Sequence, residues 1–208
     1  MTTARLEAFS DAVIAIIITI MVLELHAPDG SQWEDVRALV PVFLSYVLSF
    51  VILGIYWNNH HHMLQATERI NGRVLWANLH LLFWLSLFPF GTAWMGENHL
   101  DPLPTATYGV ILLLAAIGYY ILQTVLVHEQ PEGSALRTAL GRDLKGKSSP
   151  ALYAAAIPLA YISPLISVCL YVLVALMWLV PDRRLEAKLN ARDSVAKNFP
   201  STTTSLGS

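Results

Sequence analysis

The N-terminal stretch RLEAFSDAVIAIIITIMVLEL, from Arg5 to Leu25, combines the length of a membrane-spanning helix with ionisable groups in its first half. A helix of about 20 mostly apolar residues crosses a bilayer. Arg5, Glu7 and Asp11 are expensive in such a helix, because an Asp or Arg near the bilayer centre costs about 2.5 to 3.5 kcal/mol. Charges inside a membrane mark functional positions. We therefore expect this helix to line a pore, with the other helices holding it in place.

The composition is that of an integral membrane protein. Of the 208 residues, 55% are hydrophobic and only 13% are charged, with a mean hydropathy of +0.51. A soluble domain of this size carries about 25% charged residues. The basic residues form no patch, so no nucleic-acid partner is expected. Cys169 is the only cysteine, which excludes an internal disulfide. The first segment lacks a basic leader and an A-x-A site, which predicts a retained helix.

Six apolar segments predict an all-α membrane protein with six transmembrane helices per subunit. The segments run over residues 5–25, 33–62, 72–95, 104–128, 150–162 and 164–181. The fifth contains Pro158 and is shorter than the roughly 20 residues that a perpendicular helix needs. Residues 1–181 are therefore expected to form a six-helix channel domain. Residues 182–208 are polar and are expected to form a cytoplasmic tail.

Charge in the loops predicts the orientation. If the N-terminus is cytoplasmic, six spans place every basic residue except Arg37 on the cytoplasmic side. The opposite loops carry acidic residues, among them Asp29, Glu97 and Asp101. Since cytoplasmic loops are enriched in Lys and Arg, this partition favours six spans with both termini in the cytoplasm.

Helical geometry divides the first segment into two surfaces. With about 100° per residue, Ile20 and Leu23 lie within about 40° of Ile16, and Thr19 flanks this apolar stripe. Ser10 and Asp11 point away from the stripe, towards neighbouring helices. The stripe fits a pore lining, but the pattern alone favours ordinary packing against lipid or core.

Later segments supply polar partners for the first one. The second segment ends in YWNNHHH, and the third carries Asn78 and His80 near its cytoplasmic end. Since a half-satisfied polar group in lipid is costly, we expect a buried network. Its expected members are Arg5, Ser10 and Asp11 with some of His60, His61, Asn78 and His80. For Asp11 a structural ion pair, with Arg5 or a histidine, and a transport role remain open alternatives.

Metal and haem chemistry are not favoured. Three consecutive histidines on a helix, His60 to His62, point about 100° apart and cannot all bind one ion. A haem between His80 and one of His60–His62 is sterically possible, but nothing else in the sequence suggests redox chemistry. We expect no cofactor and no metal beyond permeant potassium.

The string R-x-x-x-F-S-D, formed by Arg5, Phe9, Ser10 and Asp11, and the later YWxxHH resemble the transmembrane protein 175 family of potassium channels. The resemblance covers about residues 4–181 and is to the bacterial form with a single six-helix repeat. It implies a homotetramer with four first helices around the axis. It further implies a potassium-permeable, voltage-independent channel of the bacterial inner membrane, passing monovalent cations with modest selectivity for potassium over sodium.

The resemblance also implies roles for individual residues. Ile16, Ile20 and Leu23 match the bulky apolar positions that form a pore constriction, and Thr19 matches a pore-lining hydroxyl. The R-x-x-x-F-S-D residues, Phe9 included, match a structural network rather than a filter. Independently of the resemblance, electrostatics predicts that Glu24 and Asp29 lie at the outer mouth, where like charges raise the local cation concentration.

Two other functions compete with a channel. A proton-coupled secondary transporter would use Asp11 and the helix-embedded histidines, but inverted repeats and paired broken helices are missing from the sequence. A membrane enzyme would use Asp11 and His60–His62, but no nucleophile or metal-ligand constellation accompanies them. We expect that the protein is not an enzyme.

Overall fold

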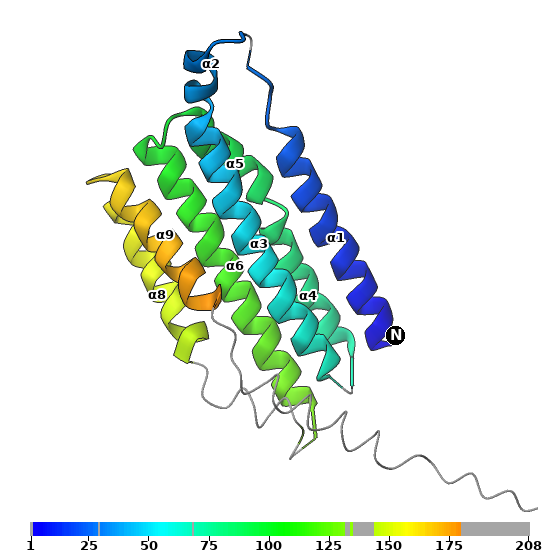
Figure 1. Ribbon diagram of the computed structural model, residues 1–208. Helices are drawn as coiled ribbons and strands as arrows, with labels where there is room; N and C mark the ends of the chain where they lie inside the picture. Colours follow the sequence, from blue (N-terminus) through cyan, green and yellow to red (C-terminus); the bar gives the residue numbers. More distant parts are fainter. Residues whose placement is uncertain (1, 29, 68, 132–133, 135–143, 180–208) are drawn as a thin grey trace, which may run out of the picture.

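A computed structural model describes residues 2–28, 30–67, 69–131, 134 and 144–179. The described residues form helices and no strand, which confirms the all-α prediction. The helices are α1 (Thr3–Leu23), α2 (Trp33–Ala38), α3 (Val40–Gln65), α4 (Gly72–Leu85), α5 (Phe88–Glu97), α6 (Pro102–Glu129), α8 (Leu144–Leu159) and α9 (Pro164–Leu179). The long helices lie side by side, with α1 at one edge of the bundle and α8 and α9 at the opposite edge (Figure 1).

Within the described residues, four stretches are long and apolar enough to cross a membrane: α1, α3, the combined α4–α5 stretch of residues 72–97, and α6. The shorter α9 is also apolar. This is the pattern of a multi-pass membrane protein. The predicted first and fourth segments agree with α1 and α6 to within two residues at each end.

The predicted second and third segments are each divided in two. Residues 33–62 were expected as one segment, but α2 ends at Ala38 and α3 begins at Val40. Pro41 lies in the first turn of α3, where its missing N–H costs no helical hydrogen bond. The third segment breaks at Ser86 and Leu87 because Pro89, which cannot donate to a helical carbonyl, opens a new helix there.

The last two helices also differ from the prediction. α8 begins at Leu144, six residues before the expected start, and its 16 residues include Pro150 and Pro158. Its length stays below the roughly 20 residues of a perpendicular span. A tight turn ends α8, where the Ser163 amide donates to the Leu159 carbonyl at 2.8 Å. The end of the predicted sixth segment and the predicted tail, residues 180–208, lie outside the described residues.

Two glycines allow neighbouring helices to approach closely. A Cβ added at Gly96 of α5 would lie 2.8 Å from Cα of Val42 in α3. A Cβ at Gly118 of α6 would lie 3.2 Å from Cα of Leu81 in α4. Backbone atoms cannot move aside as a flexible side chain can. These positions therefore fix the spacing between α3 and α5 and between α4 and α6.

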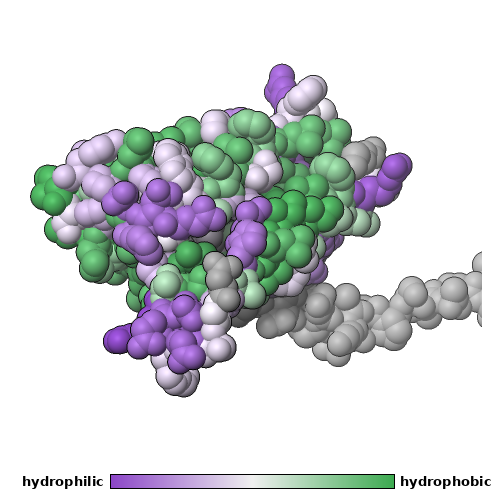
Figure 2. Space-filling view, turned by 90° about the horizontal axis from the view of Figure 1, so that it is seen from above, coloured by the Kyte–Doolittle hydropathy of each residue, from purple (hydrophilic) through white to green (hydrophobic). Residues whose placement is uncertain are grey.

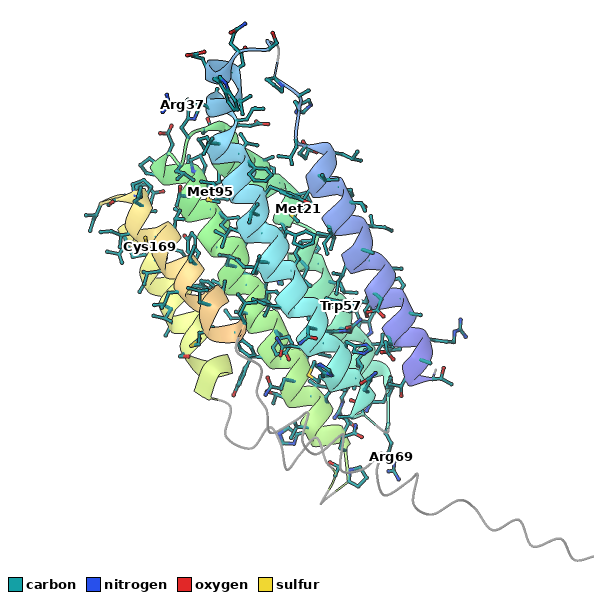
Figure 3. All side chains as sticks on the ribbon, in the orientation of Figure 1. Met21, Arg37, Trp57, Arg69, Met95 and Cys169 are labelled. Atoms are coloured by element: carbon teal, nitrogen blue, oxygen red, sulfur yellow. The ribbon has the colours of Figure 1, made fainter. Side chains whose placement is uncertain are left out.

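The ends and the sides of the bundle differ in polarity. Seen from above, hydrophilic residues gather on the end face that carries α2, and hydrophobic residues border it (Figure 2). Arg37, the one basic residue predicted to lie outside, and Arg69, predicted to lie inside, are at opposite ends of the bundle (Figure 3). The loop charges predict that these two residues lie on opposite sides of the membrane, and their positions at opposite ends of the bundle are consistent with that prediction.

Candidate functional site

α1 has one face packed against the bundle and one face that the rest of the subunit leaves uncovered. The packed face consists of Leu6, Ser10, Ile14, Ile17 and Met21, spaced at three or four residues. It lies against α3, α5 and α4. Because α1 stands at the edge of the bundle, its other face meets no neighbouring helix among those that the structure describes (Figure 1).

The uncovered face carries the residues predicted to form a constriction. Ile16 is 56% exposed, Ile20 is 41% exposed and Leu23 is 75% exposed. Thr19 is exposed beside them, and its hydroxyl donates to the carbonyl of Ile16 at 2.8 Å. Large branched side chains in such numbers on one exposed helix face require lipid or another protein surface as a partner.

Behind this face, Ser10, His60 and Asn78 form a polar cluster that is buried among α1, α3 and α4. We call it the buried cluster. Asn78 donates from Nδ2 to Oγ of Ser10 at 2.9 Å, and Ser10 donates to the carbonyl of Leu6 at 2.9 Å. Asn78 Oδ1 is then the acceptor for His60 Nε2, which lies 2.7 Å away. The sequence predicts that these three residues share a network, and the structure brings them together.

A second group, the half-buried cluster, consists of the half-buried Glu7, Asp11 and His61 together with the exposed Trp57 and Gln65. Trp57 donates from Nε1 to Asp11 Oδ1 at 3.0 Å, and His61 Nδ1 lies 2.7 Å from Glu7 Oε1. Gln65 Nε2 lies 2.9 Å from His61 Nε2, and the His61 ring stacks on Trp57 at a centroid distance of 5.8 Å. Trp57 is on α3 at the level of the first half of α1 (Figure 3). This group binds α1 to α3.

Three residues of the half-buried cluster have the chemistry of metal ligands. Single ligand atoms of Glu7, Asp11 and His61 all lie within 4.8 Å of one another. Carboxylates and an imidazole suit several divalent ions. However, each group already has a protein partner, since His61 contacts Glu7 and Trp57 donates to Asp11. Helix packing is sufficient to explain the arrangement.

Three predicted network members lie elsewhere. Arg5 and Phe9 are exposed, and the side chain of Arg5 forms no ion pair or hydrogen bond within the part of the chain that the structure describes. His80 accepts a 3.0 Å hydrogen bond from Nε1 of Trp84, one turn further along α4. The single network expected from the sequence is thus two clusters in the subunit, and neither contains Arg5 or His80.

The structure adds partners that the sequence did not single out. Glu7 and Trp57 complete the half-buried cluster, and the only signal for them is their spacing of four residues from Asp11 and His61. Ser49 contacts Thr92 and the Tyr108 hydroxyl, each at 2.7 Å, in the core between α3, α5 and α6. Thr92 also approaches the sulfur of Met21, at 3.8 Å.

The predicted outer-mouth residue lies at the other end of α1. Glu24 follows the last helical residue and is exposed. It borders an open groove between α1 and α5, whose lining also includes Ile20, Phe90, Trp94 and Glu97. Two carboxylates therefore flank the end of α1 that is remote from the two polar clusters.

Comparisons with known proteins identify similar chains. The family model described as endosomal/lysosomal potassium channel TMEM175 matches residues 5–89, which contain both clusters and the exposed face of α1. A potassium channel of Chryseobacterium sp. (strain P1-3) is 50% identical over 189 residues, covering 91% of this chain and 98% of that protein. A potassium channel of Streptomyces collinus is 30% identical over 128 residues, covering 58% of this chain and 62% of that protein.

A solved structure has the same fold. The crystal structure of a lysosomal potassium-selective channel TMEM175 homolog from Chamaesiphon minutus matches with a TM-score of 0.73 at 27% identity, covering 86% of this chain and 96% of that one. The fold and the similar proteins place this chain in the class of multi-pass ion channels. The protein is therefore not an enzyme. Within that class, the chain belongs to the TMEM175 family.

Proposed function

We propose that this chain is the subunit of a potassium-permeable channel in which four copies of α1 surround a central pore. The observation that carries the proposal is the exposed apolar face of α1, opposite a face that two polar clusters fix to the bundle. Its relatives are named potassium channels, and the similar solved structure is described as potassium-selective.

In the proposed pore, Ile16, Ile20 and Leu23 form the constriction. The three residues span about 10 Å along the helix axis. Isoleucine and leucine offer no oxygen to replace the water around an ion, so a narrow ring blocks by dewetting and a wider one passes partly hydrated cations. Such a ring discriminates weakly, which gives modest selectivity for potassium over sodium. Thr19 places a hydroxyl beside the constriction.

The polar clusters serve as anchors of the pore helix. Ser10 is held by Asn78 and, through it, by His60, while Asp11 is held by Trp57. Gating is a small rotation or dilation of α1 about these fixed points. Glu24 faces the outer mouth and raises the local concentration of cations.

The proposal extends to the surroundings of the channel. Both termini lie in the cytoplasm, residues 1–181 form the membrane domain and residues 182–208 form a polar tail. The host membrane is the bacterial inner membrane. The channel requires no cofactor, and potassium and other monovalent cations are its permeant ions.

One observation supports the competing function of a proton-coupled transporter. Asp11 and His61 belong to one half-buried cluster, which is the kind of site that exchanges protons. In that case ion movement would depend on a proton gradient, whereas a channel follows the electrochemical gradient of the ion alone.

Flux from liposomes separates the two functions. The purified protein is reconstituted into liposomes loaded with potassium, a proton ionophore is added, and protein-free liposomes with valinomycin serve as the reference. The channel predicts sustained potassium efflux without an imposed proton gradient and slower sodium efflux. Efflux that appears only when the ionophore is left out and an opposing proton gradient is imposed would favour the transporter over the channel, and no efflux under either condition would refute both.

A further inference from the structure

Arg5 stands apart from the polar groups that surround it in the sequence. Glu7 pairs with His61 and Asp11 with Trp57, but the guanidinium of Arg5 has no ion-pair or hydrogen-bond partner among the described residues. Its side chain is exposed, on a helix whose opposite face is packed. A guanidinium without a partner near the end of a pore helix calls for a role other than packing.

Helical geometry shows which face Arg5 occupies. Arg5 precedes Ile16 by eleven residues, or three turns, and so lies about 20° from it around the helix. Phe9, seven residues before Ile16, also lies about 20° from it. Phe9 is 47% exposed. The exposed stripe of Ile16, Ile20 and Leu23 therefore continues through Phe9 to Arg5 at the first turns of α1.

We propose that Arg5 and Phe9 line the inner part of the conduction path, and that four Arg5 guanidinium groups form a positive ring at its cytoplasmic entrance. This inference rests on the proposed function, in which α1 surrounds the pore. The ring repels cations and lowers their supply from the cytoplasm. The side chain thereby sets the difference between outward and inward conductance.

Simple electrostatics determines how such a ring behaves. Arg5 lies about 16 Å along the helix from Ile16, so it acts before the constriction. The screening length is about 8 Å at 0.15 M salt, about 30 Å at 0.01 M and about 3 Å at 1 M. The effect on current must therefore be large in dilute salt and vanish in concentrated salt.

The test uses single-channel recordings from the full chain in a planar bilayer. Arg5→Gln is expected to raise outward conductance in about 0.01 M potassium by roughly two- to fivefold, since charged entrances change local ion concentrations strongly. Little change is expected in about 1 M potassium, where charges are screened. Arg5→Lys keeps the charge and is expected to behave as the parent channel.

Arg73→Gln is the matched control. Arg73 is a basic residue at the start of α4, its side chain is 84% exposed, and it lies 3.6 Å from Glu129. Removing it changes the net charge by the same amount, away from the stripe on α1. Its outward conductance is expected to stay at the parent value.

Chemical modification of cysteine variants provides a second test, which applies even if Arg5→Gln fails to assemble. In a Cys169→Ser chain, Arg5→Cys and Phe9→Cys are each treated from the N-terminal side with a positively or a negatively charged thiol reagent. The positive reagent is expected to lower outward conductance and the negative reagent to raise it. If neither variant responds, while a thiol reagent still blocks Ile20→Cys, the ring is refuted and the pore stands. If Ile20→Cys is also unaffected, the proposed pore fails with it.

Discussion

Asn78 on α4 donates a 2.9 Å hydrogen bond to the hydroxyl of Ser10 on α1, and both side chains are fully buried. The same amide accepts from His60 on α3 at 2.7 Å. One side chain thus ties together the three helices that meet behind the exposed face of α1. In a bilayer no water replaces these bonds, so the contact fixes the position and the rotation of α1.

Asn78→Ala is expected to destabilise the folded channel by about 2–4 kcal/mol, because Ser10 and His60 each lose a buried partner. Asn98→Ala is the control, since Asn98 is exposed and donates only to the Trp94 carbonyl of its own helix. The measurement is the temperature at which the detergent-solubilised assembly is lost from size-exclusion chromatography. Equal losses for the two variants would show that the buried cluster does not hold α1.

Trp57→Phe is expected to remove the 3.0 Å hydrogen bond to Asp11 while keeping an aromatic ring beside His61. Hydrogen bonds to charged groups contribute about 1.5–3 kcal/mol, so a loss at or below the lower end of that range is expected at Trp57, which is 43% exposed. Trp76→Phe is the control, because Trp76 is 75% exposed. The comparison is made by thermal unfolding in lipid nanodiscs. A Trp57→Phe variant as stable as Trp76→Phe would contradict the anchoring role.

These two clusters show how far the sequence predicts the site. Ser10, Asn78 and His60 could be predicted to meet, because polar groups in apolar helices at the same depth have few other partners. The partner of Asp11 could not, because it depends on the rotation of α3, which a single sequence does not specify. Arg5 lies outside both clusters for a different reason: the prediction rests on its charge and leaves out its position on the exposed stripe of α1.

The fold shows a similar division. Hydropathy locates α1 and α6 well, because each is a continuous apolar run. It misses the break between α4 and α5, since Pro89 interrupts the helix without changing its hydrophobicity. It also starts the fifth segment at Pro150, whereas α8 continues through Pro150 and begins at Leu144.

Gly96→Ala is expected to destabilise the subunit by about 1–3 kcal/mol, because the new methyl group would meet the backbone of Val42 and separate α3 from α5. Gly54→Ala is the matched control within α3, since no atom of the subunit lies within 4 Å of its added Cβ. At that position alanine is expected to be neutral or stabilising by up to about 1 kcal/mol. Guanidinium unfolding in detergent, followed by tryptophan fluorescence, measures both. The reverse order of stabilities would contradict the packing of α3 on α5.

Ser49→Ala is expected to cost about 1–3 kcal/mol, because Thr92 and the Tyr108 hydroxyl both lose a 2.7 Å partner in the core. Ser86→Ala removes an exposed hydroxyl that donates to its own helix and is expected to be within about 0.5 kcal/mol of the parent. Thermal unfolding of the two variants and the parent, measured side by side, gives the stability change of each variant. Conductance per assembled channel is expected to be unchanged in both, and a change in Ser49→Ala alone would place that hydroxyl in the permeation path.

Accessibility of the α1 stripe to thiol reagents tests the central claim most directly. Cysteines are placed singly at Ile16, Ile20 and Leu23 in a Cys169→Ser chain, and Leu165→Cys, 61% exposed on α9 at the opposite edge of the bundle, is the control. The account predicts that the reagent blocks potassium current through the three α1 variants and leaves the Leu165→Cys current intact. Unaltered current at all three α1 positions would contradict it.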